Sequence, residues 1–386
     1  MLSLRRIAAL LALALSVAQT SHAQQRDTAA LRARLQHVLD SVRAGAQFPG
    51  AVAAIALDDG RTVAAATGMA DTAKRQPLTT DHLLLSGSVG KTYVAAVAMQ
   101  LVGEGKLRLD AKVSEYLGAE PWFSRLPNGR DATVRQLMNH TSGLVRYEFD
   151  STFLARLTAE PYRTWTPAER VAFVLDRQPP FAAGQGWEYS DTNYIVLGMI
   201  IEKLTGRPYY DELRRRILEP LGLRRTVPSD RPTIAGLSQA YAGPGNPFGG
   251  RDAMIGDDGR FAMDPQFEWT GGGIASTTRD LARWGKLLYE GRAFPDSLLP
   301  TMLDAVPAKL GPGVRYGLGV IVRDSTPLGR VWGHSGYMPG YLTEMMYFPD
   351  LKAAVALQFN TSVGRSIGRN PGRMLIEMVG AVMRRE

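Results

Sequence analysis

Apolar positions recur with helical spacing near the start of the chain. Between residues 27 and 44, five apolar side chains fall at i, i+4, i+7, i+8 and i+11, which predicts an amphipathic helix. These side chains are Leu31, Leu35, Val38, Leu39 and Val42. Two apolar runs follow, at residues 51–57 and 61–66, with the turn sequence Asp58-Asp59-Gly60 between them. This pattern predicts a β-hairpin against which the helix packs.

The middle of the chain has helical signals instead. Two capping boxes occur there, in which a hydroxyl side chain and a side chain three residues later satisfy free backbone N–H groups at a helix start. Thr133 with Gln136 forms the first, and Thr166 with Glu169 forms the second. Residues 193–205 are mostly apolar and a glycine follows them, so they predict a buried helix with a left-handed stop.

Strand signals return after about residue 265. They cover residues 316–322, residues from 331 onward, residues 342–348 and residues 353–360, and a last helix is expected near 374–384. We therefore predict an α/β (α+β) fold, with one antiparallel sheet flanked by terminal helices and an inserted, mainly helical subdomain. The α/β part is expected at about 24–85 and 265–386, and the helical part at about 86–264. The cleft between the two parts is the expected active site.

The first residues have the pattern of an export signal. Arg5 and Arg6 precede an apolar run, and Ser21-His22-Ala23 offers a small-x-small cleavage site. We expect residues 1–23 to be a signal peptide and the mature chain to begin near Gln24, in the periplasm or secreted. The apolar run is too short to span a bilayer comfortably, and no later segment has about 20 uninterrupted apolar residues. No membrane span is therefore expected once the signal is removed.

Composition narrows the possible chemistry. The chain has no cysteine, which excludes disulfides, thiol catalysis and cysteine-ligated metals. Its formal charge is +8 but Lys and Arg form no block, so no nucleic-acid partner is expected. The histidines after the signal lack metal-ligand spacing, so we expect neither a metal nor a cofactor: they are His37, His82, His140 and His334. His140 is interpreted as structural, with hydrogen bonds to loop backbone.

A hydroxyl and an amine three residues apart lie at the start of an apolar helix. Ser88 and Lys91, in the segment S-G-S-V-G-K-T, would share one helix face. Burial would help Lys91 to lose its proton and activate the serine, and the helix start offers N–H groups to an oxyanion. A P-loop is the alternative, but Leu85 stands where its first glycine is required. The S-x-x-K pattern is weak alone and needs partners elsewhere in the chain.

Two other motifs suggest different chemistry. Gly271-Gly272-Gly273 could cradle a phosphate, but Thr277 with Asp280 explains the segment better as the cap of the next helix. The G-x-S-x-G nucleophile elbow would need a glycine at position 337. Ser335 is therefore a poor nucleophile candidate.

Two further segments supply the partners that Ser88 and Lys91 need. They are Tyr189-Ser190-Asp191, before the buried helix, and residues 332–337, W-G-H-S-G-Y, among the C-terminal strands. In this order, S-x-x-K, a variant of Y-S-N and H-x-G resemble the serine β-lactamase and penicillin-binding-protein superfamily. The likeness continues through residues 101–107, 134–144, 220–223 and 271–277, and it covers nearly all of the chain after the signal.

The resemblance implies a role for each motif residue. Ser88 would be the acylated nucleophile, Lys91 its activating amine, and Tyr189 the group that moves protons to the leaving group and then to water. The backbone N–H groups of Ser88 and Tyr337 would form the oxyanion hole. Four more residues would line the substrate side of the cleft: Asp191, His334, Ser335 and Gly336. Nothing resembles the E-x-x-L-N loop of class A β-lactamases, so deacylation would depend on Tyr189.

Two positions depart from the family pattern. Asp191 stands where the family usually has asparagine, and an ionised carboxylate can only accept hydrogen bonds, so we expect Asp191 to pair with Lys91. Tyr337 stands where peptidases of this type often have a small hydroxyl residue that helps to hold a terminal carboxylate. A tyrosine there weakens the case for strict carboxypeptidase specificity.

The function favoured by the sequence is that of an exported D-alanyl-D-alanine carboxypeptidase-type enzyme, acting on D-amino-acid peptides through a Ser88 acyl-enzyme. A class C-like β-lactamase or a carboxylesterase of the same fold would share every catalytic residue. A non-catalytic sensor of β-lactams or peptidoglycan is the alternative from another class. The expected partners are a small peptide, ester or β-lactam substrate, with peptidoglycan as a further candidate.

Overall fold

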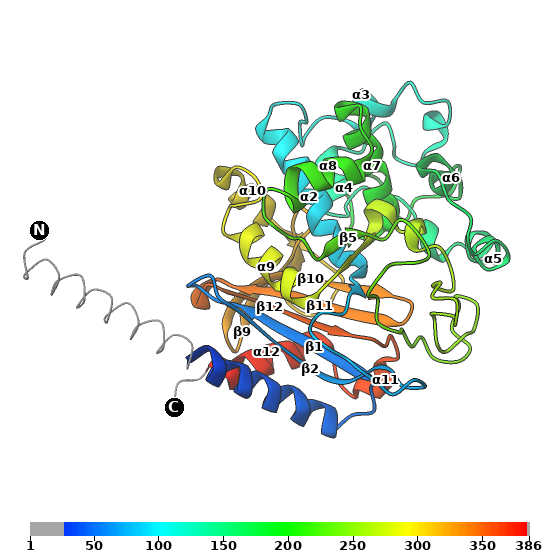
Figure 1. The fold of residues 1–386 in the computed structure, drawn as a ribbon. Coiled ribbons are helices and arrows are strands. Elements are labelled where there is room, and N and C mark those ends of the chain that lie inside the picture. Colours follow the sequence, from blue (N-terminus) through cyan, green and yellow to red (C-terminus); the bar gives the residue numbers. More distant parts are fainter. Residues whose placement is uncertain (1–26, 384–386) are drawn as a thin grey trace, which may run out of the picture.

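The computed structural model describes residues 27–383, in which a large antiparallel sheet lies beneath a mass of helices (Figure 1). The strand order is β3-β2-β1-β12-β11-β10-β9-β8-β7. The strands are β1 (Gly50–Ala56), β2 (Thr62–Asp71), β3 (Gln76–Pro77), β7 (Val306–Pro307), β8 (Val314–Tyr316), β9 (Ile321–Thr326), β10 (Gly329–Met338), β11 (Tyr341–Phe348) and β12 (Ala353–Phe359). Because β1 pairs with β12, strands from the two ends of the chain meet inside the sheet.

Helices fill the middle of the chain and return near its end. They are α2 (Gly90–Gly103), α3 (Val113–Leu117), α4 (Val134–Met138), α5 (Ser151–Ala159), α6 (Pro167–Ala172), α7 (Asp191–Thr205), α8 (Tyr209–Leu213), α9 (Thr278–Tyr289), α10 (Leu299–Leu303), α11 (Gly364–Ile367) and α12 (Pro371–Met383). A small sheet, in the order β4 (Leu84–Leu85), β6 (Ile274–Ser276), β5 (Thr226–Pro228), lies beside the start of α2.

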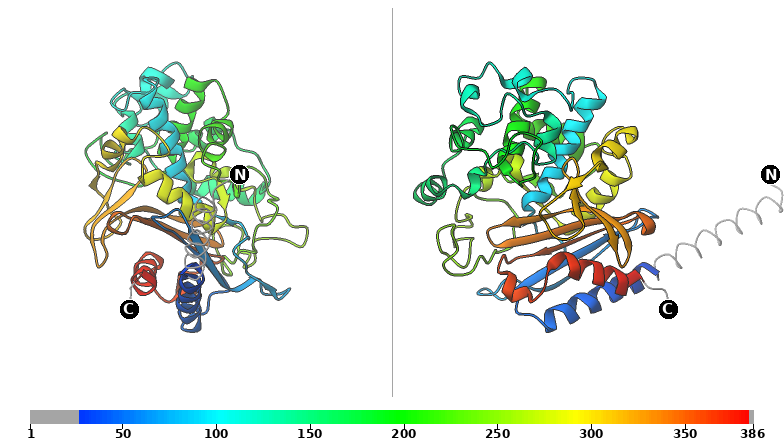
Figure 2. Two further views of the ribbon diagram at one scale, coloured as in Figure 1. Left: turned by 60° about the vertical axis from the view of Figure 1, so that its left-hand side comes forward. Right: turned by 180° about the vertical axis from the view of Figure 1, so that it is seen from behind.

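Two helices from the ends of the chain cover one face of the large sheet. The helix at residues 27–44 and α12 lie side by side beneath the strands (Figure 2). Leu35 and Leu39 of the first helix and Leu375 of the second are fully buried in the core that they share with the sheet. The amphipathic helix predicted at residues 27–44 and the hairpin that follows it are therefore confirmed.

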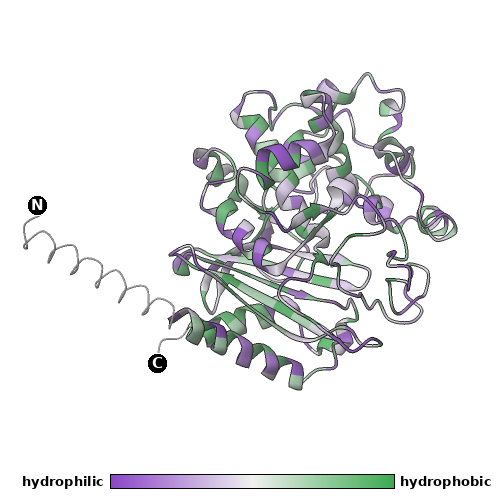
Figure 3. Ribbon diagram, in the orientation of Figure 1, coloured by the Kyte–Doolittle hydropathy of each residue, from purple (hydrophilic) through white to green (hydrophobic). Residues whose placement is uncertain are grey.

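Helix α9 covers the other face, where it contacts β1, β11 and β12. Strand β1 is buried along its whole length because it is covered on both faces, and its residues are nearly all apolar for that reason. Figure 3 shows hydrophobic residues concentrated in these strands and hydrophilic ones on the outer helices. The antiparallel sheet with terminal helices and a helical region is confirmed, while the boundaries near residues 85 and 265 remain a prediction.

The strand predicted over residues 316–322 is wrong in its extent. It is divided into β8 and β9, and the chain between them leaves the sheet to pack on α2. Leu318 and Gly319 donate backbone hydrogen bonds to the carbonyls of Met302 and Met138. Gly319 has a φ of +76°, and a Cβ there would come within 2.7 Å of the Cβ of Ala95. Only glycine allows this detour.

The predicted helix caps are present. Thr133 and Thr166 each accept a hydrogen bond from the backbone three residues on, and each capping box is closed by the Gln136 or Glu169 side chain. Within residues 27–383, no helix is long and apolar enough to cross a bilayer. The predicted signal peptide, residues 1–23, lies outside the described residues.

Candidate active site

Ser88 lies in a short 3₁₀ turn, Gly87–Val89, that leads directly into α2. Gly87 has a φ of +50°, and a Cβ there would fall 2.8 Å from the backbone nitrogen of Tyr337. A Cβ on Gly336 would fall 2.0 Å from the carbonyl oxygen of Ser86. Glycines at both positions therefore let strand β10 approach the nucleophile turn backbone to backbone.

Gly272 makes a similar approach from the opposite side. A Cβ on Gly272 would come within 2.6 Å of the Gly87 carbonyl and 3.0 Å of the Ser88 nitrogen. The Gly271-Gly272-Gly273 run thus packs against the nucleophile turn. These glycines allow close backbone contact with the nucleophile turn. The helix cap at Thr277 and Asp280 does not account for this contact.

Lys91 is fully buried one helical turn after Ser88. Its Nζ donates to Ser88 Oγ at 3.0 Å and also to Asp191 Oδ1 and to the carbonyl oxygen of Gly271. These three acceptors match the three protons of an ammonium group. The ion pair expected between Lys91 and Asp191 is therefore present, and Lys91 also orients the Ser88 hydroxyl.

The expectation that burial would help Lys91 to lose its proton is wrong. Burial does disfavour the ammonium form, but the Asp191 carboxylate and its hydrogen bond outweigh it, and the pKa of Lys91 ends above its usual value. In this state Lys91 is a positively charged hydrogen-bond donor. A protonated Lys91 has no lone pair with which to accept the Ser88 proton.

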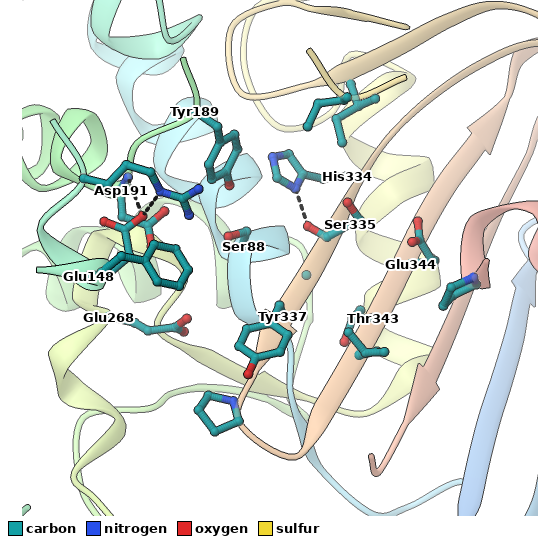
Figure 4. Close-up of a pocket in the computed structure, with 18 of the residues that line it drawn as sticks. Ser88, Glu148, Tyr189, Asp191, Glu268, His334, Ser335, Tyr337, Thr343 and Glu344 are labelled. Atoms are coloured by element: carbon teal, nitrogen blue, oxygen red, sulfur yellow. Dashed lines mark hydrogen bonds and ion pairs between the residues drawn. The ribbon is translucent and has the colours of Figure 1, made fainter. Parts of the chain in front are cut away.

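Tyr189 is placed to exchange that proton. Its hydroxyl is buried and points toward Ser88 (Figure 4). Lys91 Nζ lies 4.8 Å from the centre of the tyrosine ring. Burial raises the pKa of Tyr189 to about 12, against the lowering effect of the nearby Lys91 charge. Tyr189 is therefore in a position to exchange a proton with Ser88, the role that the sequence predicts for it.

Two buried histidines surround Tyr189. The His140 ring lies 4.2 Å from the Tyr189 ring, centre to centre, and its Nδ1 accepts the backbone N–H of Ser190. The backbone hydrogen bonds expected for His140 are therefore present, but it also packs on a predicted catalytic residue. The His334 Nε2 lies 2.7 Å from the Tyr316 hydroxyl, and its Nδ1 lies 2.6 Å from the carbonyl of Ser335. Both nitrogens of His334 are thus occupied by the protein, which argues against the direct substrate contact predicted for it.

The register of the β10–β11 hairpin is compatible with the oxyanion hole predicted at Tyr337. Met338 pairs with Tyr341 to close a two-residue turn, and backbone groups then alternate between facing β11 and facing away. Tyr337, one residue back, therefore directs its N–H away from β11. Strand β9 pairs with β10 only up to Gly333, so this part of the β10 edge is open to the cleft beside Ser88.

The cleft beside Ser88 is a cavity of about 430 Å³. Five of the predicted site residues line it together with the nucleophile: Tyr189, Asp191, His334, Ser335 and Gly336, and Tyr337 stands at its rim with its side chain 43% exposed. Within residues 27–383 no group of three or more His, Cys, Asp or Glu side chains could hold a metal ion.

The sequence analysis missed an acidic wall on one side of Ser88. Glu148, Asp191 and Glu268 come from three separate segments and lie together there (Figure 4). Arg146 donates to Glu148 Oε1 at 2.7 Å, whereas Glu148 Oε2 has no partner within the described residues. Glu268 is 7% exposed and makes no side-chain hydrogen bond in residues 27–383. In the sequence, these acids are marked only by their position next to motifs. Glu148 follows the segment N-H-T-S-G-L at residues 139–144, and Glu268 precedes the glycines at 271–273.

The two glutamates of this wall, Glu148 and Glu268, have raised pKa values. Burial and the neighbouring Asp191 raise the pKa of Glu148 to about 7, although Arg146 opposes the shift. Burial and Asp191 also raise the pKa of Glu268 to about 8. Near neutral pH the wall therefore carries protons that a cationic ligand would displace.

The fold and this serine–lysine–tyrosine site define a serine hydrolase. The family model for Beta-lactamase matches residues 31–376, and the chain belongs to that family. A D-aminopeptidase from Brucella anthropi is 27% identical over 88% of this chain and 61% of its own length. The chain thus spans about three fifths of the length of this relative, and the same share of Penicillin-binding protein 4* from Bacillus subtilis.

Solved structures give the same class. A D-stereospecific amidohydrolase from Streptomyces sp. has 32% identity and a TM-score of 0.74, covering 90% of this chain and 97% of its own. A D-amino acid amidase from Ochrobactrum anthropi SV3, solved with L-phenylalanine amide, has 27% identity and a TM-score of 0.76, covering 92% of this chain and 97% of its own. The chain is similar to enzymes that cleave amides as well as to penicillin-binding proteins.

Proposed function

We propose that this protein hydrolyses amide bonds at the carboxyl group of a D-amino acid whose α-amino group is free, through an acyl-enzyme on Ser88. This is an aminopeptidase or amidase activity, whereas the sequence favoured a carboxypeptidase. The acidic wall beside Ser88 carries the proposal. The D configuration of the substrate is taken from the relatives, a D-aminopeptidase and a D-amino acid amidase.

The charges in the cleft favour a cationic substrate. Both cations of the site are already paired within the protein, Lys91 with Asp191 and Arg146 with Glu148. Glu268 and the free oxygen of Glu148 remain without partners in the described residues. An ammonium group on the substrate would supply the missing positive charge, because a buried carboxylate is stable when it is paired.

A C-terminal carboxylate would find no unpaired cation among the described residues that line the same cleft. Burial and the charge of Lys91 lower the pKa of His334 to about 3, so this residue is neutral in the working pH range. Arg146, the remaining cation that lines the cavity, is engaged by Glu148. A carboxypeptidase needs a positive group for the terminal carboxylate of its substrate. The cleft therefore suits an amine better than an acid.

The proposed reaction uses the groups already described. Ser88 Oγ bonds to the carbonyl carbon while Tyr189 relays the hydroxyl proton to the leaving nitrogen, and the C–N bond breaks. The N–H groups of Ser88 and Tyr337 would hold the oxyanion. Water then attacks the ester carbon, Tyr189 relays a water proton back to Ser88, and the free acid leaves. Lys91 remains an ammonium donor to Ser88 throughout.

The test compares D-alanine p-nitroanilide, its N-acetylated form, its L enantiomer and an acyl-D-Ala-D-Ala peptide, each with the wild-type chain and with Ser88→Ala. We expect cleavage of the free D-amine to be fastest, and loss of at least about a thousandfold in Ser88→Ala. Faster cleavage of the N-acetylated substrate, or release of D-alanine from the peptide, would overturn the aminopeptidase assignment. Each mixture is also examined by intact-protein mass spectrometry for an acyl adduct on Ser88.

The same experiment addresses the rival functions. A penicillin adduct that persists without amide cleavage would favour the penicillin-binding or sensor alternative, and rapid penicillin hydrolysis would favour a β-lactamase. A short-chain ester cleaved in preference to all amides would favour a carboxylesterase. Export is part of the proposal, since the leader pattern of residues 1–23 is that of a signal peptide. Mass spectrometry of the protein from its native cell, with a mature N-terminus near Gln24, would support it.

A further inference from the structure

Glu344 is a second buried acid that the proposed reaction does not use. It lies on β11, lines the cavity, and is only 8% exposed. Its Oε2 has no hydrogen-bond partner within residues 27–383, and no ion pair involves its carboxyl group there. Figure 4 shows it on the opposite side of Ser88 from the acidic wall.

The surroundings of Glu344 form a small polar recess. Ser335 on β10 is its cross-strand partner, and its neighbour Thr343 also lines the cavity. A Cβ on Gly372, near the start of α12, would lie 3.4 Å from Glu344 Oε2. The glycine therefore lies directly beside the carboxyl group. Glu344 Oε2 is buried without a hydrogen-bond partner among the described residues, and both Ser335 and Glu344 line the cavity.

Leaving such a carboxyl group unpaired is unfavourable. Burial raises the pKa of Glu344 to about 7, and Arg323 on β9 opposes the shift without forming an ion pair. A buried acid without a protein partner is stabilised when a ligand brings a positive charge or hydrogen-bond donors to it. The cavity supplies the route by which a ligand group would reach it.

The chemistry of the site decides which part of the substrate lies there. The free amine of the acyl half is assigned to the acidic wall of Glu148 and Glu268. The leaving half must lie toward Tyr189, which protonates it, and this side of the cleft continues along His334 and Ser335 to Glu344. A side chain of the residue after the scissile bond would therefore extend toward Glu344.

We propose that Glu344 recognises an ammonium or guanidinium group on the leaving residue, so that the enzyme prefers peptides in which a basic residue follows the D-amino acid. This inference rests on the proposed function, because it takes the free-amine peptide as substrate. Ser335 Oγ completes the recess as a hydrogen-bond acceptor. The resulting specificity concerns the released residue, whereas the acidic wall selects the acyl residue.

The test uses D-alanyl-L-lysinamide and D-alanyl-L-norleucinamide, which differ at the leaving side chain by the terminal ammonium. Release of lysinamide or norleucinamide is measured for the wild type, for Glu344→Gln and for Asp324→Asn. Asp324 is a matched control because its carboxylate is exposed on β9, pairs with Arg315 and does not line the cavity. We expect the wild type to favour the lysinamide by about tenfold in kcat/KM, a ratio of the size that one charge-assisted hydrogen bond gives.

In Glu344→Gln the ratio should fall to near one through loss of lysinamide cleavage, and Asp324→Asn should keep the wild-type ratio. Equal cleavage of both substrates by the wild type, or an unchanged ratio in Glu344→Gln, would overturn the inference while the proposed function stands. Cleavage of neither substrate would overturn both. Should Glu344→Gln fail to fold, inhibition of wild-type D-alanine p-nitroanilide cleavage gives the same decision. Both amides carry an α-ammonium, but only lysinamide carries a second one, so lysinamide should inhibit at a lower concentration than norleucinamide, and equal inhibition would overturn the inference.

Discussion

Lys91 and Asp191 are 100 residues apart in the sequence and form a buried ion pair beneath the nucleophile. The pair joins the start of α2 to the start of α7, and it holds Lys91 in position to donate to Ser88 Oγ. The aspartate thus gives the lysine a fixed charge and a fixed direction. Its carboxylate acts within the protein instead of binding the substrate carbonyl, the role of the asparagine that is usual in the family.

Asp191→Asn should destabilise the protein and change its activity. Removing one member of a buried pair costs on the order of 3 kcal/mol of unfolding free energy, because the remaining charge loses its partner. The raised pKa of Lys91 means that the stabilisation is complete below the unfolded lysine pKa of about 10 and is lost only as pH rises through the higher folded value. The loss of unfolding free energy in Asp191→Asn, measured by urea unfolding, should therefore be constant from pH 6 to 9.

The matched control is Asp176→Asn, which breaks an exposed pair with Arg125 and should leave the unfolding free energy unchanged. In Asp191→Asn the alkaline limb of the kcat/KM profile should move to lower pH, because Lys91 loses the carboxylate that raises its pKa. An unchanged stability and pH profile would show that the ion pair has no part in either property.

Glu268→Gln should weaken binding of cationic substrates selectively. The glutamine keeps the shape of the side chain but cannot carry the charge that pairs with an ammonium group. We expect KM for D-alanine p-nitroanilide to rise about tenfold and any residual cleavage of the N-acetylated form to stay the same. Steady-state kinetics at pH 8 measures both, and an equal loss on the two substrates would mean that Glu268 only supports the fold.

The contribution of Glu148 and Glu268 to folding stability should fall as pH rises from about 5 to 8. The pKa of Glu268 is about 8 and that of Glu148 about 7 in the folded chain, above the unfolded glutamate value of about 4.3. The folded state then binds more protons than the unfolded state in this window, so the stability that these groups contribute is present at low pH and lost on raising it. Thermal unfolding across this pH range should show a shallower decline for Glu268→Gln than for the wild type. Parallel curves would contradict the protonated wall.

Gly336→Ala should abolish activity. A Cβ at this position would lie 2.0 Å from the carbonyl oxygen of Ser86, so β10 would have to move away from the nucleophile turn. Displacing the Tyr337 N–H by even a fraction of an ångström should cost at least about a hundredfold in kcat, the size of one lost oxyanion-hole donor. Gly380→Ala in α12 is the control, because a Cβ there has space and alanine suits a helix. Comparable activity of the two variants would contradict the close approach.

Most of the fold could be predicted from local patterns, and the site only in part. The helix at residues 27–44, the first hairpin and the two capping boxes depend on short-range spacing, which the sequence states directly. The division between β8 and β9 could not be predicted from the sequence. It arises because Gly319 packs outside the sheet against Ala95, and the two residues are far apart in the sequence. The motifs identified Ser88, Lys91 and Tyr189, and their proximity follows from the fold.

The acids of the cleft had no comparable signal. Glu148, Glu268 and Glu344 lie in unremarkable segments, and only burial in a shared cavity makes them chemically unusual. The protonation of Lys91 was also misjudged, because burial alone suggests loss of a proton while the neighbouring Asp191 reverses the effect. The pKa of a buried group depends on burial and on several neighbouring charges at once. These neighbours are known only from the three-dimensional structure.

The pairing of β1 with β12 has a consequence for the order in which the chain can be completed during synthesis. Residues 353–359 are made about 300 residues after the strand whose edge they cover. Until they emerge from the ribosome, β1 presents unpaired N–H and C=O groups and a strand made almost entirely of apolar side chains. A chain still being translated therefore cannot close its central sheet, and it remains in a state that chaperones or a translocation channel can engage.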